Sequence, residues 1–432
     1  MIHFIDGGVT APQGFTANGI LCHIKSSRKT NDTALIFSDT PCTAAGVFTQ
    51  NRVQAEPVKL TRKHLADGRA QAIIANSGNA NACTGAQGAA NALRMAQAVS
   101  KKLGIQTEDV VVCSTGVIGQ QLPIEKIESN IERLAGGLCK QGHEEARIAI
   151  MTTDTRCKEC AVQTEIGGKV VRLGTQAKGS GMIHINLGTM LGFITTDAAI
   201  SSTMLEKALR RSVAGTYNCV SIDGDTSTND TLVILANGRA GNAEIAGEGA
   251  DFDTFCAALD ALNTQMAKKI AADGEGAGRL IECTVKGAVD VPTARALAKS
   301  VISSTLVKAA FFGRDANWGR VLCALGYSGE YFDPAKCSVY FASVKGAARY
   351  FDETSVTDIT GIVNGSFTSS ARSIKVCDHG VPLDFDEALA KEILSEEALG
   401  ILVELEDGDA LGTAWGCDLT YEYVKINGDY RT

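Results

Sequence analysis

The chain has 432 residues, 45% hydrophobic content, a net charge of −8 and a pI near 5.4. These values predict a globular protein with a large core, and the acidic balance argues against a general binding surface for nucleic acid or anionic membrane. The N-terminus lacks a basic segment followed by an apolar one, and no apolar run is long enough to span a bilayer, so we expect a cytoplasmic protein.

Helices and strands are predicted along the whole chain in mixed order. Apolar periodicity and β-branched runs predict, in chain order, strand 71–76, helix 89–104, strand 109–114, helix 123–138, strand 231–237, helix 251–273, strands 279–289 and 337–344, helix 386–394, and strands 401–406 and 418–426. Several strands follow one another without a helical crossover. The expected fold class is therefore α+β, a layered sandwich of mixed sheets and helices packed as one body.

The cysteines give no sign of a metal centre. Fourteen are spread along the chain, as expected for thiols in a reducing compartment. The only CxxC pair is Cys157 and Cys160, and a zinc site would need two further ligands that no second CxxC or spaced histidine pair supplies. We expect neither a metal nor a bound cofactor.

Forty-five glycines concentrate in short stretches that are candidates for site loops. The stretch DGEGAG (273–278) resembles a dinucleotide fingerprint, but it follows a predicted helix and leads into a strand, the reverse of the required context. The chain has no GxSxG, Walker or HExxH motif. An enzyme with this sequence would have to activate its nucleophile in another way, for example through the α-amine of an N-terminal threonine.

The pair Gly188 and Thr189, within NLGTML (186–191), fits that solution. The Thr189 hydroxyl could attack the Gly188 carbonyl, and hydrolysis of the resulting ester would free an amine with a pKa near about 8, low enough to act as a general base. Glycine tolerates the strained backbone that this attack requires. The same pattern also fits a buried strand with a turn.

Several longer motifs decide between these interpretations. They are GGVTAPQGFTANGI (7–20), AGVFTQNRVQAEPV (45–58), SGNANACTG (77–85), CSTGVIG (113–119), TTDT (152–155), KGSGMIHINLGTMLGFITTDA (178–198), DGDTSTNDT (223–231), DGEGAGRLIE (273–282), KAAFFGRDANWGRV (308–321) and YEYVKINGDYRT (421–432). In this order they resemble the glutamate N-acetyltransferase, or ornithine acetyltransferase, family of arginine biosynthesis. The resemblance covers essentially the whole chain.

The resemblance implies a precursor that cleaves itself between Gly188 and Thr189. It implies an α segment, 1–188, and a β segment, 189–432, that stay packed together, with two copies of each in a heterotetramer. Thr189 would be the nucleophile, and Thr115 and Gly116 would form the oxyanion hole. The implied substrate contacts are Thr155, Lys178, Thr189, Glu275, Asn427 and Thr432.

The reaction implied is ping-pong transfer of an acetyl group from N-acetylornithine to glutamate through an acetyl-threonine intermediate. Lys178 would suit a substrate carboxylate, and Glu275 would suit the distal ammonium of acetylornithine. Acetyl-CoA would be a second donor only in a bifunctional member, and the motifs do not separate the bifunctional from the monofunctional type.

This chain departs from the family pattern at two places. Ile185 stands where a proline is usual, and Gly188 replaces the usual residue before the nucleophile; Arg156, Cys157 and Lys158 also follow TTDT in place of a proline-lysine pair. Two other functions remain open. An N-terminal-nucleophile amidase or aminopeptidase would pass the acyl group to water, and a non-catalytic amino-acid-binding protein would neither cleave itself nor exchange acetyl groups.

Overall fold

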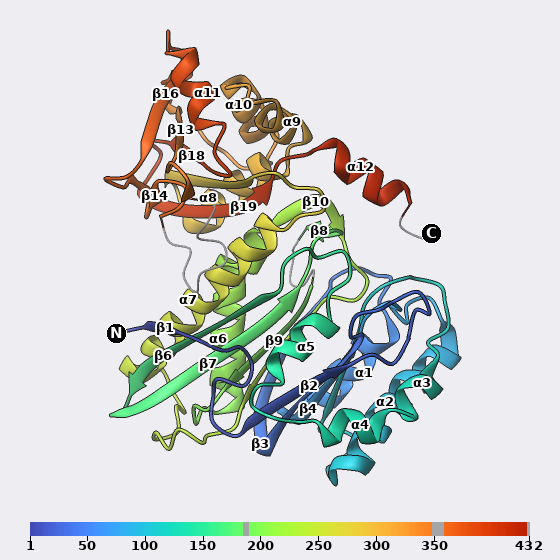
Figure 1. Ribbon diagram of the computed structural model, residues 1–432. Helices are drawn as coiled ribbons and strands as arrows, with labels where there is room; N and C mark the ends of the chain where they lie inside the picture. The colour runs from blue at the N-terminus through green and yellow to red at the C-terminus, as the bar shows by residue number, and fades with distance from the viewer. Residues whose placement is uncertain (185–189, 348–357, 430–432) are drawn as a thin grey trace. The chain divides into compact units, whose positions relative to one another are not determined.

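The computed structural model describes residues 1–184, 190–347 and 358–429 (Figure 1). The chain divides into two compact units. Unit 1 comprises Met1–Ala214 and Asp225–Met266, and unit 2 comprises Gly215–Gly224 and Ala267–Thr432. Helices alternate with mixed parallel and antiparallel strands in both units, which confirms the expected α+β class.

Unit 1 is built on a nine-stranded sheet. Its order is β1-β6-β7-β9-β11-β3-β4-β5, with β2 paired to β3. The strands are β1 (His3–Ile5), β2 (Phe15–Ile20), β3 (Thr33–Phe48), β4 (Arg69–Asn76), β5 (Val110–Ser114), β6 (Lys158–Ile166), β7 (Lys169–Lys178), β9 (Leu191–Thr196) and β11 (Thr231–Ala236). Strand β8 (Ile183–His184) also belongs to unit 1, whereas β10 (Ser221–Thr226) spans the boundary between the units, with its first four residues in unit 2.

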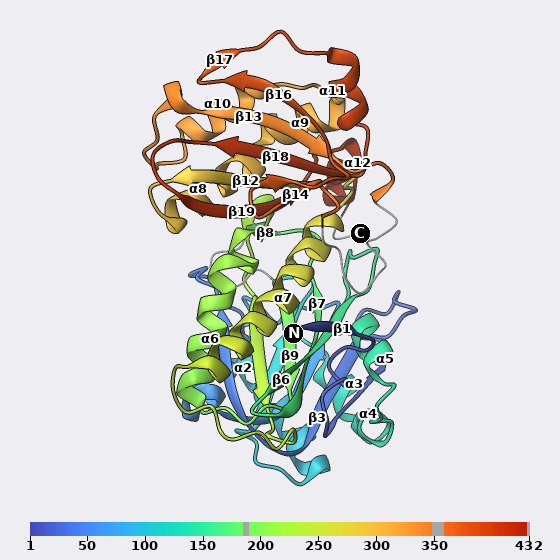
Figure 2. The same ribbon diagram turned by 90° about the vertical axis from the view of Figure 1, so that its left-hand side faces the viewer.

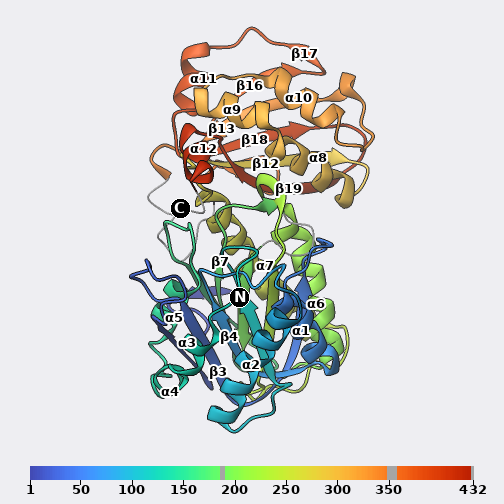
Figure 3. The same ribbon diagram turned by 90° about the vertical axis from the view of Figure 1, so that its right-hand side faces the viewer.

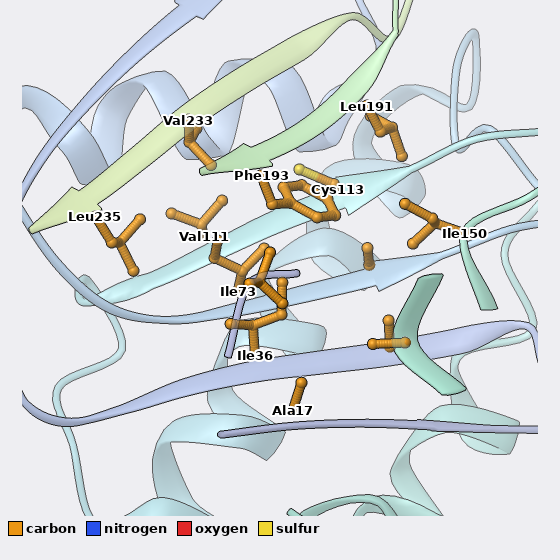
Figure 4. Close-up of a cluster of buried hydrophobic side chains, with 14 of the residues drawn as sticks. Ala17, Ile36, Ile73, Val111, Cys113, Ile150, Leu191, Phe193, Val233 and Leu235 are labelled. Carbon is orange, nitrogen blue, oxygen red and sulfur yellow. The ribbon is translucent and has the colours of Figure 1, made fainter. Parts of the chain in front are cut away.

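Strand β3 joins the two halves of this sheet. Its first residues pair with β2 and β4, whereas its last residues pair with β11. The register with β4 is interrupted between Phe37 and Cys42, where Pro41 has no N–H to donate. The two halves of the sheet face each other across one apolar cluster (Figure 4), as in a sandwich.

The two-residue period of the strands explains how this core forms. On β4, Ile73 and Ala75 point into the cluster between the sheet halves. Ala72 and Ile74 point to the other face, where they pack against helical residues such as Met95. Because β4 is buried on both faces, its sequence is a continuous apolar run, and this run predicted the strand.

Helices cover the outer faces of unit 1. They are α1 (Glu56–His64), the 3-10 turn η1 (Leu65–Asp67), α2 (Gly85–Leu103), α3 (Ile124–Glu128), α4 (Ile131–Gly136), α5 (His143–Ala149), α6 (Ser202–Gly215) and α7 (Ala250–Ala272), the last shared with unit 2. α1 packs on β5, and α2 packs on β4 and β5. α6 and α7 lie over the half that contains β6, β7 and β9 (Figure 2). The Asn263 amide of α7 donates to Ser212 Oγ of α6, at 3.0 Å.

Unit 2 contains a six-stranded sheet in the order β17-β16-β13-β18-β12-β19. The strands are β12 (Leu280–Ala288), β13 (Ser338–Ser343), β16 (Arg372–Asp378), β17 (Val381–Pro382), β18 (Ala398–Glu404) and β19 (Ala410–Cys417), with a small hairpin of β14 (Ile362–Val363) and β15 (Ser366–Phe367). Helices α8 (Val291–Ser303), α9 (Thr305–Gly313) and α10 (Trp318–Gly326) cover one face (Figure 3). The remaining helical elements are α11 (Glu387–Ile393), α12 (Tyr421–Gly428), η2 (Tyr217–Cys219) and η3 (Pro334–Lys336).

Two of the predicted elements are wrong in detail. The helix predicted over 123–138 is two short helices, because Asn130 donates its side-chain amide to the Lys126 carbonyl, at 2.8 Å, and competes with the backbone. The strand predicted over 418–426 is the helix α12. Thr420 caps it by accepting from the Glu422 N–H, at 3.2 Å, and so the apparent alternation of apolar residues there does not mark a strand.

Among the described residues, no single helix is long and apolar enough to span a membrane. Helices α8 and α9 satisfy the length and composition test only together, as a pair bent by 58°.

Candidate active site

The predicted oxyanion-hole residues Thr115 and Gly116 directly follow strand β5. The Thr115 N–H donates to the Asn76 carbonyl, at 2.9 Å, which extends the pairing of β5 with β4 by one residue. Gly116 has a φ of +133°, and a Cβ there would lie 2.4 Å from the backbone carbon of Gly78. Only glycine fits this position, because any side chain would collide with the neighbouring loop.

The Gly116 N–H has no hydrogen-bond acceptor within the described part of the chain. The Thr115 side chain is buried, and its Oγ1 accepts from the Lys178 ammonium at 3.3 Å. A hydroxyl, a backbone N–H and an ammonium therefore lie together at the ends of β5 and β7. This set of donors is suited to an oxygen that becomes negative during a reaction.

Lys178 is the last residue of β7 and pairs in register with Leu191, the first residue of β9. The Met190 carbonyl accepts from the Thr231 N–H, at 2.8 Å, so β9 is held on its other side by β11. The predicted cleavage site, Gly188 and Thr189, lies outside the described residues, as does Ile185.

A buried ion pair organises the loop that carries Thr155. The Asp154 carboxylate accepts from Lys158 Nζ at 2.7 Å and from the Gly179 and Thr152 N–H groups at 2.8 and 3.0 Å. Burial opposes ionisation, but the Lys158 and Lys178 ammonium groups and these hydrogen bonds hold the pKa of Asp154 well below its usual range. Because Gly179 follows Lys178, Asp154 fixes the backbones of Thr155 and Lys178 relative to each other.

Asp230 lies at the start of β11 and is also buried, but its environment differs from that of Asp154. Its Oδ2 has no hydrogen-bond partner within the described part of the chain. Burial raises the pKa of Asp230 well above its usual range, although the Ser227 and Thr49 hydroxyls and the Lys178 ammonium act in the opposite direction. Burial thus favours the protonated form of Asp230, which lies near Lys178.

In unit 2 the structure brings together Glu275 and Asn427. The Asn427 amide donates to Glu275 Oε2 at 2.7 Å, and the Glu275 side chain is buried. Thr420 donates to the Gly276 carbonyl at 2.6 Å. These bonds attach α12 to the glycine-rich loop within unit 2. The predicted contact Thr432 lies outside the described residues.

The distribution of the predicted site residues follows the two units. Thr115, Gly116, Thr155 and Lys178 belong to unit 1, while Glu275 and Asn427 belong to unit 2. Sequence reasoning missed Asp154 and Asp230 as site residues, although both belong to motifs that it singled out. The presence of an acidic residue inside each motif could have marked Asp154 and Asp230 as candidates. Their buried partners could not be predicted, because the tertiary fold determines them.

All fourteen cysteines are free thiols, ten of them buried; Cys157 is exposed and Cys160 is buried. Within residues 1–184, 190–347 and 358–429, no group of three or more His, Cys, Asp or Glu side chains could hold a metal ion.

Comparison with known proteins agrees with the motifs. The ArgJ family model matches residues 16–432. The chain belongs to the ArgJ family. It is 46% identical over 431 residues to the arginine biosynthesis bifunctional protein ArgJ of Caldanaerobacter subterraneus subsp. tengcongensis, and 47% identical over 432 residues to that of Symbiobacterium thermophilum, in each case covering 100% of both chains.

A solved ArgJ-related structure, ornithine acetyltransferase complexed with ornithine from Mycobacterium tuberculosis, is 40% identical. The match covers 43% of this chain and 99% of that chain, with a TM-score of 0.41. The family expected from the motifs is thus confirmed by the ArgJ model and by relatives that align over the full length.

Proposed function

We propose that this protein is a bifunctional glutamate N-acetyltransferase of arginine biosynthesis. It transfers the acetyl group of N-acetylornithine to glutamate through an acetyl ester on Thr189. It also acetylates glutamate from acetyl-CoA, as the name of its full-length relatives, arginine biosynthesis bifunctional protein, suggests. Acetyl-CoA is a substrate here, and the reaction needs no resident cofactor.

The observation that carries this proposal is the donor set around Thr115. The Lys178 ammonium donates to the Thr115 hydroxyl, which is followed in the chain by the Gly116 N–H, and Lys178 pairs with Leu191, where β9 begins. β9 starts two residues after Thr189. This arrangement supports a tetrahedral oxyanion next to a nucleophile that precedes β9.

In the first half-reaction, Thr189 Oγ attacks the acetyl carbonyl carbon of N-acetylornithine, and the Thr189 α-amine takes the hydroxyl proton. The carbonyl oxygen becomes negative and is stabilised by Thr115 and Gly116. The C–N bond then breaks, the proton passes from the Thr189 amine to the leaving α-nitrogen, and ornithine departs.

In the second half-reaction, the neutral α-amine of glutamate attacks the acetyl ester on Thr189. The same oxyanion site serves this step, the proton of the attacking amine returns to Thr189 Oγ, and N-acetylglutamate leaves. With acetyl-CoA as donor, the thioester carbon is attacked in the same way and the CoA thiol is the leaving group.

The catalyst arises from the precursor by an N-to-O acyl shift at Gly188 and Thr189, followed by hydrolysis of the ester. The pairing of β7, from the proposed α segment, with β9, from the proposed β segment, supports segments that stay together after cleavage. Two α and two β segments form the proposed heterotetramer, and the cytoplasm is the proposed location.

In unit 2, Glu275 is proposed to bind the distal ammonium of acetylornithine, and Asn427 orients it through the 2.7 Å hydrogen bond to Oε2. Lys178 is proposed to attract the substrate carboxylate as well as the oxyanion. Thr155 and Thr432 complete the proposed substrate contacts.

The test is an acetyl-transfer assay with N-[¹³C]acetylornithine, run with and without glutamate, on the parent and on Thr189→Ala. The proposal expects labelled N-acetylglutamate from the parent only, with little free acetate. Labelled acetate at the same rate with or without glutamate would identify a hydrolase. Binding without any transfer of label would indicate an amino-acid-binding protein.

A further inference from the structure

Asn229, in the loop between β10 and β11, uses its whole side-chain amide in buried hydrogen bonds. Nδ2 donates to the Ala80 carbonyl at 2.6 Å and to the Ser114 carbonyl at 2.8 Å. Oδ1 accepts from the Thr228 hydroxyl, at 2.6 Å. Since both Nδ2 acceptors are carbonyl oxygens, the NH2 group must face them, and an aspartate of the same shape could not replace it.

The two carbonyls belong to strand β5, directly before Thr115, and to the loop after β4, which bonds to the chain directly after Gly116. Ser114 immediately precedes Thr115, and the Ala80 N–H donates to the Val117 carbonyl, at 3.0 Å, one residue after Gly116. The Asn229 side chain therefore links strand β5, which ends directly before Thr115, to the loop around Ala80, which is bonded to Val117.

The peptide group between Ser114 and Thr115 is fixed at both of its polar ends. Its carbonyl oxygen accepts from Asn229, and its N–H donates to the Asn76 carbonyl at 2.9 Å. A peptide is planar, so holding both ends fixes the plane that ends at the Thr115 Cα. The Thr115 side chain is attached at that Cα, and the Gly116 N–H belongs to the next peptide along the chain. Loss of the Asn229 bond would free one end and let both donors rotate.

We propose that Asn229 is a positioning residue for the oxyanion site, which aims the Thr115 hydroxyl and the Gly116 N–H without touching the substrate itself. The inference rests on the proposed acetyl transfer, because it assigns a role within that reaction. Donors at an oxyanion site must be held within fractions of an ångström, and a displacement of about 1 Å can cost about 100-fold in rate.

The chain offers a matched control in Asn242. Its Nδ2 also donates to two backbone carbonyls, of Ala199 and Ala243, at 3.1 and 2.7 Å, and its side chain is buried to a similar degree. Ala199 lies beyond the far end of β9, away from Lys178. Asn242→Ala removes a comparable pair of bonds from unit 1 but leaves the oxyanion segment intact.

The experiment measures acetyl transfer and amide hydrogen exchange for the parent, Asn229→Ala and Asn242→Ala. We expect Asn229→Ala to lower kcat about 100-fold with KM for N-acetylornithine within about twofold, because the hydrogen bonds to the oxyanion form fully only in the transition state. Exchange should accelerate in the peptide covering 112–117. Asn242→Ala should keep kcat within about threefold and leave exchange at 112–117 unchanged.

The outcomes separate this inference from the proposed function. An active parent with an unimpaired, folded Asn229→Ala would overturn the role of Asn229 alone, as would unchanged exchange at 112–117. A parent that transfers no acetyl would remove the proposed function, while the exchange data would still decide whether Asn229 fixes the segment.

If Asn229→Ala does not fold, Asn229→Ser keeps one donor, and we expect about a tenfold loss of kcat; unchanged kcat would overturn the role of Asn229.

Discussion

Asp154 and Asp230 are two buried carboxyl groups near Lys178, and their pKa values are shifted in opposite directions. Asp154 has an ammonium partner and two backbone donors, and its pKa is depressed. Asp230 has one oxygen without a partner within the described part of the chain, and its pKa is raised by burial. Similar burial is thus compatible with opposite shifts of the pKa, because the local donors decide whether a buried charge is stable.

The difference has a consequence for the site. The Lys178 ammonium lowers the pKa of both carboxyl groups. At Asp154 the ammonium groups and hydrogen bonds outweigh burial, whereas at Asp230 burial outweighs them. Asp230 therefore offsets the positive charge near Thr115 less than Asp154 does.

The largest effect on stability is expected from a substitution that removes the charge of Asp154. Asp154→Asn removes the negative charge that the buried Lys158 ammonium contacts, and it places an amide NH2 where Oδ2 accepts from the Thr152 N–H, so it should lower the free energy of unfolding at pH 7 by about 3–5 kcal/mol. Urea denaturation monitored by circular dichroism measures this. Asp154→Leu combined with Lys158→Met should recover most of the loss; a single variant as stable as the parent would disprove the anchoring role.

The pH dependence of the Asp154 contribution has a definite sign. A depressed pKa in the folded state stabilises the protein above the unfolded pKa of about 3.9, and this stabilisation is lost as the pH falls through the folded pKa. The stability difference between the parent and Asp154→Asn should therefore be constant near neutral pH and shrink in acid.

Asp230→Asn should behave in the opposite way and with a smaller effect. A raised pKa means that folding favours the protonated form, so the contribution of Asp230 is fully present below the unfolded pKa of about 3.9 and declines as the pH rises. Relative to the parent, Asp230→Asn should gain stability between pH 4 and pH 8, by less than Asp154→Asn loses. Urea titrations at several pH values test this; a variant that loses stability with rising pH would mean that Asp230 is ionised.

Glu275 is a third buried acidic residue, and it accepts a hydrogen bond from Asn427. Glu275→Gln should lower the free energy of unfolding by only about 1 kcal/mol. If Glu275 binds the distal ammonium, KM for N-acetylornithine should rise about tenfold, while the acetyl-CoA reaction should change little. Equal effects on both donors would contradict that assignment, and Asn427→Ala should reproduce a weaker form of the same pattern.

The sequence predicted those helices and strands whose apolar residues follow a regular spacing along the chain. Strands β4 and β5 are continuous apolar runs, and α2 and α7 have helical periodicity, so their existence follows from burial alone. The segment that forms helix α12 was wrongly predicted as a strand. The start of this helix depends on the Thr420 cap and on the contact of Thr420 with Gly276, which the apolar pattern does not record. That contact joins residues 144 positions apart.

For the site, motifs predicted which residues matter but not how they are held. Thr115 and Lys178 were both expected, yet their contact joins residues 63 positions apart and depends on how β3 folds the sheet. Asp154 and Asn229 belong to quoted motifs, but the acceptors and donors that define their roles come from other segments. Long-range hydrogen bonds of this kind have no sequence period that could reveal them.

The central claim is that Thr189 becomes an N-terminal nucleophile that carries the acetyl group. Intact-mass spectrometry of the purified, denatured protein, before and after incubation with N-acetylornithine, tests it most directly. We predict two fragments that meet between Gly188 and Thr189, with one acetyl mass added to the fragment that begins at Thr189. A single uncleaved chain that gains no acetyl group, even after prolonged incubation, would contradict the claim.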